Sequence, residues 1–324
     1  LTEGANISPD PARVMDYSHP QKFTVTSEDG NWHKEYSVII DTFDLPLRYD
    51  FEHYELNETG KYQVFFEETQ GTALFKQYIW ASGNSGFALT GVGRNPQEYP
   101  TVSIENGIDG SRAIKLETKS TGQFGETVKM PIAAGNLFLG SFDVNNAVQK
   151  PLKATRFGLP FGKKPLQLKG YYKYTPGTQP FKAKDKNGNT VTIPGQEDEG
   201  DIYAVLYEAA ELDGKALDGN NVLTSEYIVA LARVEVEKKD EFTAFHVDFH
   251  YRSRIPIDWP KFIRDQRDPS DDGTAPYLSF SEEKMKNYEY NLAVVFTSSK
   301  YGAYFAGSVG STLCIDKVEI VCEK

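Results

Sequence analysis

Residues 201–208, with the sequence DIYAVLYE, alternate regularly between two kinds of side chain. Ile202, Ala204 and Leu206 form one apolar face of this stretch. The opposite face carries the more polar side chains Asp201, Tyr203 and Tyr207. A period of two is typical of a β-strand, in which successive side chains point to opposite sides of the sheet. The pattern predicts a strand with one face packed in a core and the other open.

The same alternation recurs in residues 166–174 and 242–251, and turn-forming Gly, Asn, Asp and Ser clusters separate the strand-like stretches. In 242–251 the apolar face holds Phe245 and Phe249, with His246, Asp248 and His250 opposite. Helical patterns are scarce, and we expect helices only at 259–267 and at 281–288, where Ser281 is the expected N-cap. The sequence therefore predicts an all-β protein.

The amino-acid composition argues against some classes of binding partner. Among 324 residues, 46 are acidic and 35 basic, which gives a net charge of −11. That balance argues against nucleic acid and anionic membrane surfaces, because both select basic faces. Aromatic residues make up 13% of the chain, and aromatic rings favour strands and also provide stacking platforms for sugars.

The chain divides by pattern into an opening β-module at 1–42, a linker at 43–47 and a large domain at 48–324. It begins at Leu1, so we interpret it as a mature or trimmed fragment whose targeting segment has been removed. Cys314 and Cys322 lie in one expected strand, roughly 26 Å apart at about 3.3 Å per residue. That separation is beyond disulfide reach, and we expect free thiols.

Several separated motifs resemble one protein family. They are AGNLFLG at 134–140, FGLPF at 157–161, KGYYKY at 169–174, DIYAVLYE at 201–208 and GSTLCIDKV at 310–318. In this order they resemble the putative carbohydrate metabolism domain of Bacteroidetes surface proteins, over about residues 48–324. Residues 1–42, especially FTVTSEDG at 23–30, are similar to the end of an immunoglobulin-like module.

The resemblance implies a jelly-roll β-sandwich related to carbohydrate-binding modules, carried behind a lipoprotein signal. It implies that the protein handles glycans at the cell surface or in the periplasm, with a membrane reached only through a removed lipid anchor. Glycan binding in polysaccharide utilisation is the leading hypothesis. A glycoside hydrolase and an adhesive or structural surface subunit are the alternatives.

The same resemblance implies a structural calcium site. In jelly-roll carbohydrate-binding modules the first and last strands are neighbours, and an early Glu with a late Asp often holds Ca²⁺. Glu52 and Asp316 occupy the corresponding places, and carboxylate oxygens suit this hard cation. By alternation Asp316 shares a face with Cys314, Val318 and Ile320, so its carboxylate needs a partner. An ordinary hydrogen bond or ion pair is the alternative to calcium.

Three other stretches are weaker candidates for metal binding. The turn at 185–189 lacks the sixth-position Gly and twelfth-position Glu of an EF-hand, so we interpret it as a hairpin. The acidic loop at 268–273 is interpreted as solvated. His246, Asp248 and His250 lie on one face, which is a pattern compatible with Zn²⁺, although no ligand from another strand can be named.

Catalysis and sugar binding call for different residues. Glycoside hydrolysis needs two suitably spaced carboxylates, and Asp201 with Asp248 is the candidate pair on polar strand faces. Sugar binding needs aromatic platforms beside polar groups. The candidate binding residues are Trp80, Asn84, Tyr171, Tyr203, Tyr207, His246 and Trp259. Trp80 and Trp259 are the first choices, and core packing is the alternative for each.

Overall fold

The computed structural model describes residues 4–11, 21–38, 44–69, 75–212, 215–268, 270 and 273–324. The chain forms two compact units, Leu1–Asp44 and Leu45–Lys324. Residue 43 of the predicted linker and residues 269, 271 and 272 of the acidic loop lie outside the described residues.

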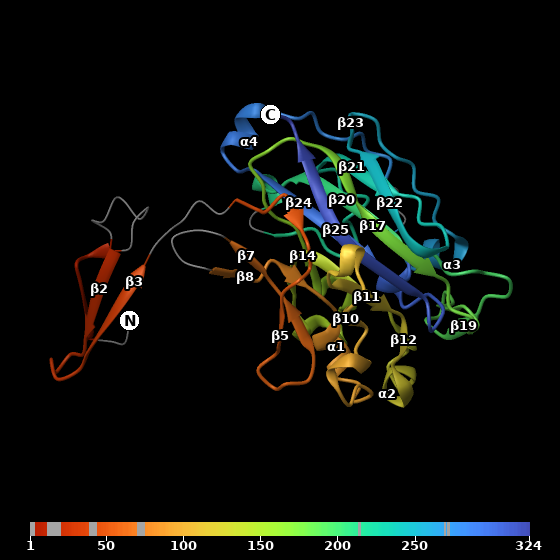
Figure 1. Ribbon diagram of the computed structural model, residues 1–324, viewed down its shortest axis with the longest axis horizontal. Coiled ribbons are helices and arrows are strands. Elements are labelled where there is room, and N and C mark those ends of the chain that lie inside the picture. The colour runs from red at the N-terminus through yellow and green to blue at the C-terminus, as the bar shows by residue number, and fades with distance from the viewer. Residues whose placement is uncertain are drawn as a thin grey trace. The chain divides into compact units, whose positions relative to one another are not determined.

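The first unit is a three-stranded antiparallel sheet in the order β1-β2-β3 (Figure 1). Its strands are β1 (Asn6–Ser8), β2 (Gln21–Thr26) and β3 (His33–Val38). Thr26 pairs with His33 across the turn, as the pattern around residues 28–31 predicts. Its relation to immunoglobulin-like modules stays a prediction.

The second unit contains two large antiparallel sheets (Figure 1). The first has the order β10-β11-β25-β17-β22, with β4 also paired to β25. Its strands are β4 (Arg48–Tyr49), β10 (Thr101–Ile104), β11 (Ala113–Glu117), β17 (Pro165–Thr175), β22 (Lys239–Asp248) and β25 (Thr312–Cys322). We call it the six-stranded sheet.

The other large sheet has the order β15-β14-β24-β20-β21-β23, with β9 on β14 and β16 on β24. Its strands are β9 (Trp80–Ala81), β14 (Asn136–Phe142), β15 (Thr155–Phe157), β16 (Leu159–Pro160), β20 (Asp201–Glu208), β21 (Ile228–Val234), β23 (His250–Tyr251) and β24 (Tyr290–Thr297). We call it the eight-stranded sheet.

Small elements fill the connections. Short strand pairs are β5 (Tyr54–Leu56) with β6 (Gln63–Phe65), β7 (Glu67–Thr69) with β8 (Phe75–Gln77), β12 (Lys119–Ser120) with β13 (Ile132–Ala133), and β18 (Lys182–Lys184) with β19 (Thr190–Thr192). The α-helices are α1 (Asn84–Ala88), α2 (Gly122–Thr127), α3 (Lys261–Arg264) and α4 (Glu282–Lys286). The predicted helices are confirmed, and the Ser281 side chain caps α4 by accepting the Lys284 N–H. Alternation did not predict α1 or α2.

The two large sheets face each other across the main core, which confirms the predicted β-sandwich. Ile202, Ala204 and Leu206 of β20 point into this core, as their alternation requires. Phe245 and Phe249 reach it from the six-stranded sheet. His246, Asp248 and His250 are exposed, in agreement with the alternation of residues 242–251.

Strand β25 departs from simple alternation. Leu313 and Ile315 enter the main core, but so do Val318 and Ile320, which lie at the other parity. The change occurs at Lys317, whose φ of 46° is left-handed, and the register with β17 shifts between Lys169 and Tyr171. A β-bulge of this kind reverses the facing of every later side chain. The prediction that Asp316 shares a face with Val318 and Ile320 is therefore wrong.

The eight-stranded sheet is covered on both faces, because a second core packs against the side that faces away from the six-stranded sheet. Tyr203, Tyr207 and Val295 belong to this second core, together with Leu217 and Leu223 from the chain that covers the sheet. The polar-looking face of β20 is therefore largely buried. Alternation identified the two faces of the strand but could not predict this cover.

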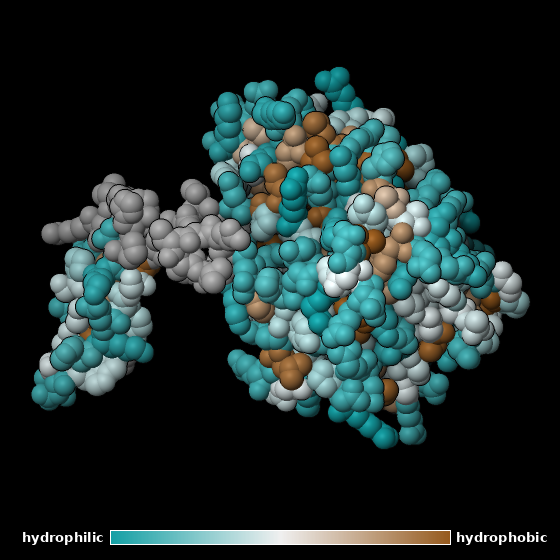
Figure 2. Space-filling model, in the orientation of Figure 1, coloured by the Kyte–Doolittle hydropathy of each residue, from teal (hydrophilic) through white to brown (hydrophobic). Residues whose placement is uncertain are grey.

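On the side shown in Figure 2, the surface has the mixed hydropathy that is usual for a folded protein. Hydrophilic residues dominate there, with separate smaller apolar areas. Scattered exposed apolar residues are normal on folded proteins. Among the described residues, none of the helices has both the length and the apolar character needed to cross a membrane.

Candidate functional site

A pocket of about 190 Å³ lies on the outer side of the eight-stranded sheet, beside the second core, whose members Phe138, Tyr203 and Val295 line it. Its floor comes from three neighbouring strands, through Asp201 and Tyr203 of β20, Val295 of β24 and Phe138 of β14. Tyr203 pairs with Val295, and Val295 pairs with Phe138. These three side chains therefore form one row across the sheet. The floor is therefore rigidly held by the ladder.

The walls come from loops and short helices. They are contributed by residues in 83–90, 121–134, 142–155, 219–223 and 299–305, and by Trp259 and Arg267. Segments far apart in the sequence thus meet around one hollow. Loops placed by a rigid sheet are the usual carriers of binding residues.

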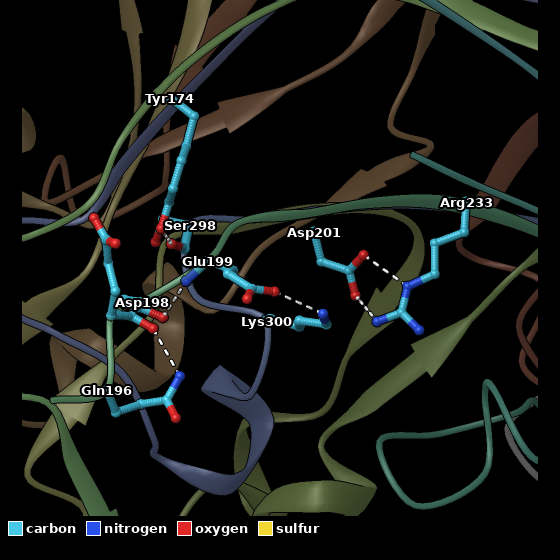
Figure 3. Close-up of polar contacts among 9 residues, drawn as sticks. Tyr174, Gln196, Asp198, Glu199, Asp201, Arg233, Ser298 and Lys300 are labelled. Atoms are coloured by element: carbon cyan, nitrogen blue, oxygen red, sulfur yellow. Dashed lines mark hydrogen bonds and ion pairs between the residues drawn. The ribbon is translucent and has the colours of Figure 1, made fainter. Parts of the chain in front are cut away.

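Asp201 brings a charge to the pocket floor. Its carboxylate accepts two hydrogen bonds from Arg233, at 2.9 Å from Nε and 2.6 Å from Nη2 (Figure 3). Asp201 is almost completely buried. Burial by itself lowers the pKa of Arg233, but the adjacent carboxylate raises it by more, so the guanidinium stays charged. The pair is a bidentate clamp that fixes the position of the Asp201 oxygens.

Trp259 and Arg267 form a second polar element of the wall. The Arg267 guanidinium lies 4.4 Å from the centre of the Trp259 ring and donates to the Tyr304 hydroxyl at 2.6 Å. The indole Nε1 of Trp259 is buried and makes no hydrogen bond to the described part of the chain, and the same is true of Thr155 Oγ1. Both residues line the pocket. A buried polar atom without a partner costs about 1–3 kcal/mol.

Asp198 is a buried acid that accepts a hydrogen bond from Ser299, a residue of the pocket wall. Asp198 Oδ2 accepts from Ser299 Oγ at 2.6 Å, Ser308 N at 2.8 Å and Ser311 Oγ at 2.7 Å. Burial raises the pKa of Asp198 to about 6, although these hydrogen bonds act in the opposite direction. The Glu199–Lys300 ion pair, 2.7 Å long, lies between the Asp198 cluster and the Asp201–Arg233 pair in Figure 3. Lys300 and Ser299 both line the pocket.

The structure places Trp80 in the main core rather than at a surface. Only 4% of the residue is exposed, and its ring packs 5.0 Å from Tyr49 and 5.5 Å from Phe51. Asn84 is buried as well, where its amide exchanges two hydrogen bonds with the backbone of Thr101. The expectation of an open sugar platform at these two residues disagrees with their positions, because both are held by packing and internal hydrogen bonds.

The other predicted binding residues are spread over both sheets. Tyr203 and Trp259 line the pocket, whereas Tyr207 is buried and donates from its hydroxyl to the Phe157 carbonyl at 2.6 Å. Tyr171 and His246 lie on the outer face of the six-stranded sheet. The structure therefore joins only two of the seven predicted residues at the pocket.

The predicted catalytic pair is separated by the sandwich itself. Asp201 lies on the outer side of the eight-stranded sheet, while Asp248 lies exposed on the outer side of the six-stranded sheet and accepts from Gln167 at 2.7 Å. The main core lies between them. The pairing of Asp201 with Asp248 is therefore wrong, because alternation says which face a residue takes but not which sheets share a face.

Glu52 and Asp316 contact the same loop, residues 107–112. Glu52 Oε1 accepts from the Arg112 N–H at 2.9 Å, and Asp316 Oδ2 accepts from the Ile108 N–H at 2.6 Å. The Lys317 N–H donates to the other Asp316 oxygen at 2.7 Å. N–H groups and a cation compete for the same lone pairs, so these contacts favour the hydrogen-bonding alternative. Calcium at this pair stays a prediction.

Removal of metal provides a direct test of that alternative. Because hydrogen bonds already satisfy Asp316, we expect EDTA to leave the melting temperature of the protein unchanged. Differential scanning fluorimetry with EDTA, followed by added CaCl₂, measures this. A melting temperature that falls with EDTA and recovers with calcium would instead establish the calcium site.

The weaker metal candidates have ordinary structures. Residues 185–189 form the turn of the β18–β19 hairpin, in which Asp185 accepts from the N–H groups of Asn187 and Asn189. His250 belongs to β23 of the eight-stranded sheet, and His246 to β22 of the other. Within the ranges that the structure describes, no group of three or more His, Cys, Asp or Glu residues is placed to hold a metal ion.

Sequence reasoning missed Arg233, Arg267 and Thr155. Arg233 had a readable signal, since it is the single charge in the otherwise apolar strand IVALARV at 228–234. An isolated charge in a buried strand needs a partner of opposite sign. Arg267 and Thr155 offered no comparable signal, because their role depends on loops that meet only in the folded chain.

Another buried acid, Glu67, lies beside Trp80 of the main core and does not line the pocket. Glu67 accepts from Trp80 Nε1 at 2.8 Å. Burial raises the pKa of Glu67 to about 7, the Trp80 hydrogen bond partly offsets this, and Asp50 raises the pKa further. The folded state therefore prefers the protonated acid. As pH rises from about 4.5 to about 7, the unfolded chain loses this proton first, and stability falls.

A Glu67→Gln variant tests this origin of pH dependence. We expect it to be more stable than the natural chain at pH 8, by up to about 3 kcal/mol, and to lose this advantage near pH 4.5. Urea unfolding at several pH values measures the difference. Glu68→Gln removes the neighbouring, more exposed carboxylate and serves as the control. Equal pH slopes in the natural chain and Glu67→Gln would contradict the expectation.

Comparison with known proteins finds a family model and two similar structures. A family model described as "putative carbohydrate metabolism domain" matches residues 50–321. A structure of a putative glycoside hydrolase from Bacteroides thetaiotaomicron is 42% identical, with a TM-score of 0.71, over 100% of this chain and 84% of that one. Another, from Bacteroides vulgatus, is 34% identical, with a TM-score of 0.68, over 87% and 100%. A comparison with curated proteins finds no match.

Proposed function

This chain belongs to the family of the putative carbohydrate metabolism domain, and we propose that it binds a carbohydrate in the pocket on its eight-stranded sheet. The observation that carries the proposal is Trp259, which presents an aromatic ring in the pocket wall and a buried Nε1 without a partner. A sugar offers both an apolar ring face and hydroxyl acceptors. The Trp259 ring in the pocket wall matches the apolar ring face of a sugar.

The charged residues of the pocket complete the polar side. Asp201 accepts hydrogen bonds, Lys300 donates them, and both are held in place by ion pairs with Arg233 and Glu199. Prepositioned groups of this kind lose little freedom when a ligand binds. The polar side therefore suits the hydroxyl groups of a saccharide.

Trp259→Ala is expected to weaken carbohydrate binding by about tenfold or more, because it removes the aromatic face and the unpaired N–H together. A glycan array with the full chain identifies a ligand, and calorimetry with that ligand gives the affinity. Trp32→Ala is the matched control, since Trp32 is 56% exposed in the first unit. Fluorimetry checks that both variants fold. An intact chain that binds no glycan, or equal affinity in Trp259→Ala, would refute the proposal.

Hydrolysis is the second candidate, and it is favoured by the names of the two Bacteroides structures. Retaining or inverting mechanisms need two carboxylates. Among the described residues that line the pocket, Asp201 is the one carboxylate, and Arg233 holds both its oxygens. Binding is therefore the better-supported function. Release of reducing sugar from host or plant polysaccharides by the purified chain would instead favour the hydrolase.

We also propose that the protein works at the surface or in the periplasm of a Bacteroidetes cell, attached through a lipid anchor. The family membership supports this location indirectly. Surface proteolysis and fractionation of cells that express the full-length gene measure it. An adhesive or structural role in the same place would be favoured if the chain pulls down outer-membrane partners and binds no glycan.

A further inference from the structure

One side of the pocket is apolar. Its half-exposed members come from two segments, α2 with the residues after it and the connection between β14 and β15. The apolar wall consists of Phe124, Val128, Met130, Phe142 and Val148. None of the five is fully buried, although Phe142 also packs against the second core.

The local structure explains why the wall faces the pocket. Phe124 lies in α2 and Val128 caps its end, and a spacing of four residues places two side chains on the same helix face. On the other segment, a Cβ at Gly86 would lie 3.1 Å from the Phe142 ring. The glycine thus leaves room for Phe142 beside α1. Phe124 remains 41% exposed, so much of its ring surface is accessible beside the pocket.

The apolar wall and the polar side lie over different strands. Asp201 is on β20, whereas Phe142 ends β14 and pairs with Thr155 of β15, at the far edge of the sheet order β15-β14-β24-β20. Two interstrand spacings of about 4.8 Å separate β20 from β14, or roughly 10 Å. A ligand that contacts both sides therefore has a polar end and an apolar end.

From this arrangement we propose that the natural ligand is a saccharide that carries an aromatic aglycone, with the aryl ring against the apolar wall. The inference rests on the proposed function and adds the substrate class. Sugar hydroxyls would lose hydration against this wall without gaining partners, whereas an aryl ring gains contact with Phe124, Phe142 and Met130.

The test compares aryl and methyl glycosides of the same sugars. Calorimetry with the full chain uses 4-nitrophenyl and methyl glycosides of glucose, galactose, mannose, xylose, fucose and N-acetylglucosamine. We expect the nitrophenyl form of the recognised sugar to bind at least about tenfold more tightly than the methyl form. In Phe124→Ser and Val148→Ser this ratio should approach one, because the apolar contact with the aryl ring is lost.

Leu166→Ser is the matched control, because Leu166 is 39% exposed and lies on β17 of the other sheet. It should keep the full aryl preference. Fluorimetry checks the fold of each variant. Equal binding of aryl and methyl glycosides would overturn the aryl inference and leave the proposed function intact. Binding of no glycoside would overturn both. A dimer that Phe124→Ser dissociates would overturn the aryl inference, because the apolar wall would then contact a second copy of the chain.

Discussion

Replacement of Trp80 by alanine is expected to lower the free energy of unfolding by about 3–5 kcal/mol, the range for a large aromatic residue removed from a core. The ring packs against Tyr49, Phe51 and Phe296 between the two sheets. The change also removes the N–H that Glu67 accepts. The loss therefore combines an unfilled cavity with a buried acid that has lost its hydrogen-bond donor.

Urea unfolding of the full chain at pH 7 measures this effect. Trp80→Phe is the matched variant, because it keeps an aromatic ring but lacks the N–H, and we expect it to lose clearly less stability than Trp80→Ala. If Trp80→Ala keeps normal stability but no longer retains a glycan, Trp80 belongs to a binding surface as the sequence suggests, and the core assignment is wrong.

Replacement of Arg233 by alanine is expected to cost about 3–5 kcal/mol, because it leaves the Asp201 carboxylate buried without its partner. Asp201 is 2% exposed and receives two hydrogen bonds from Arg233. Simultaneous replacement of both residues by leucine removes the unpaired charge as well. The double variant should recover most of the stability, since buried ion pairs often exchange for apolar residues at little cost.

Chemical unfolding of the single and double variants separates these outcomes. Arg48→Ala is the control, because its exposed ion pair with Glu319 has a length of 3.4 Å and should matter little. A double variant as unstable as Arg233→Ala would show that the side chains matter through packing rather than charge. The same double variant should also bind carbohydrate more weakly, as Asp201 lies on the pocket floor.

Strand identity and facing were predictable wherever alternation was regular. Residues 201–208 and 242–251 show their core faces directly in the sequence, and the Ser281 cap marks the start of α4. These features depend on neighbours within a few residues. The same reasoning failed at Lys317, where one left-handed residue changes the register of β25.

The candidate site was only partly predictable. Trp259 and Asp201, both named from the sequence, line the pocket, and their roles stay predictions. Trp80 was chosen by the same criterion and lies in the core. An aromatic residue in a strand-rich sequence has the same local signature in either place, because its burial depends on segments distant in the chain.

The sequence by itself determined that the chain is acidic and rich in β-strands, and which side chains share a face in the strands that alternate regularly. It also carried the family motifs. Only the tertiary structure decided that Asp201 and Asp248 lie on opposite sides of the main core, and that a second core covers the other face of β20. The physical reason is that alternation is a property of one strand, whereas a pocket depends on which strands pair and which loops cover them.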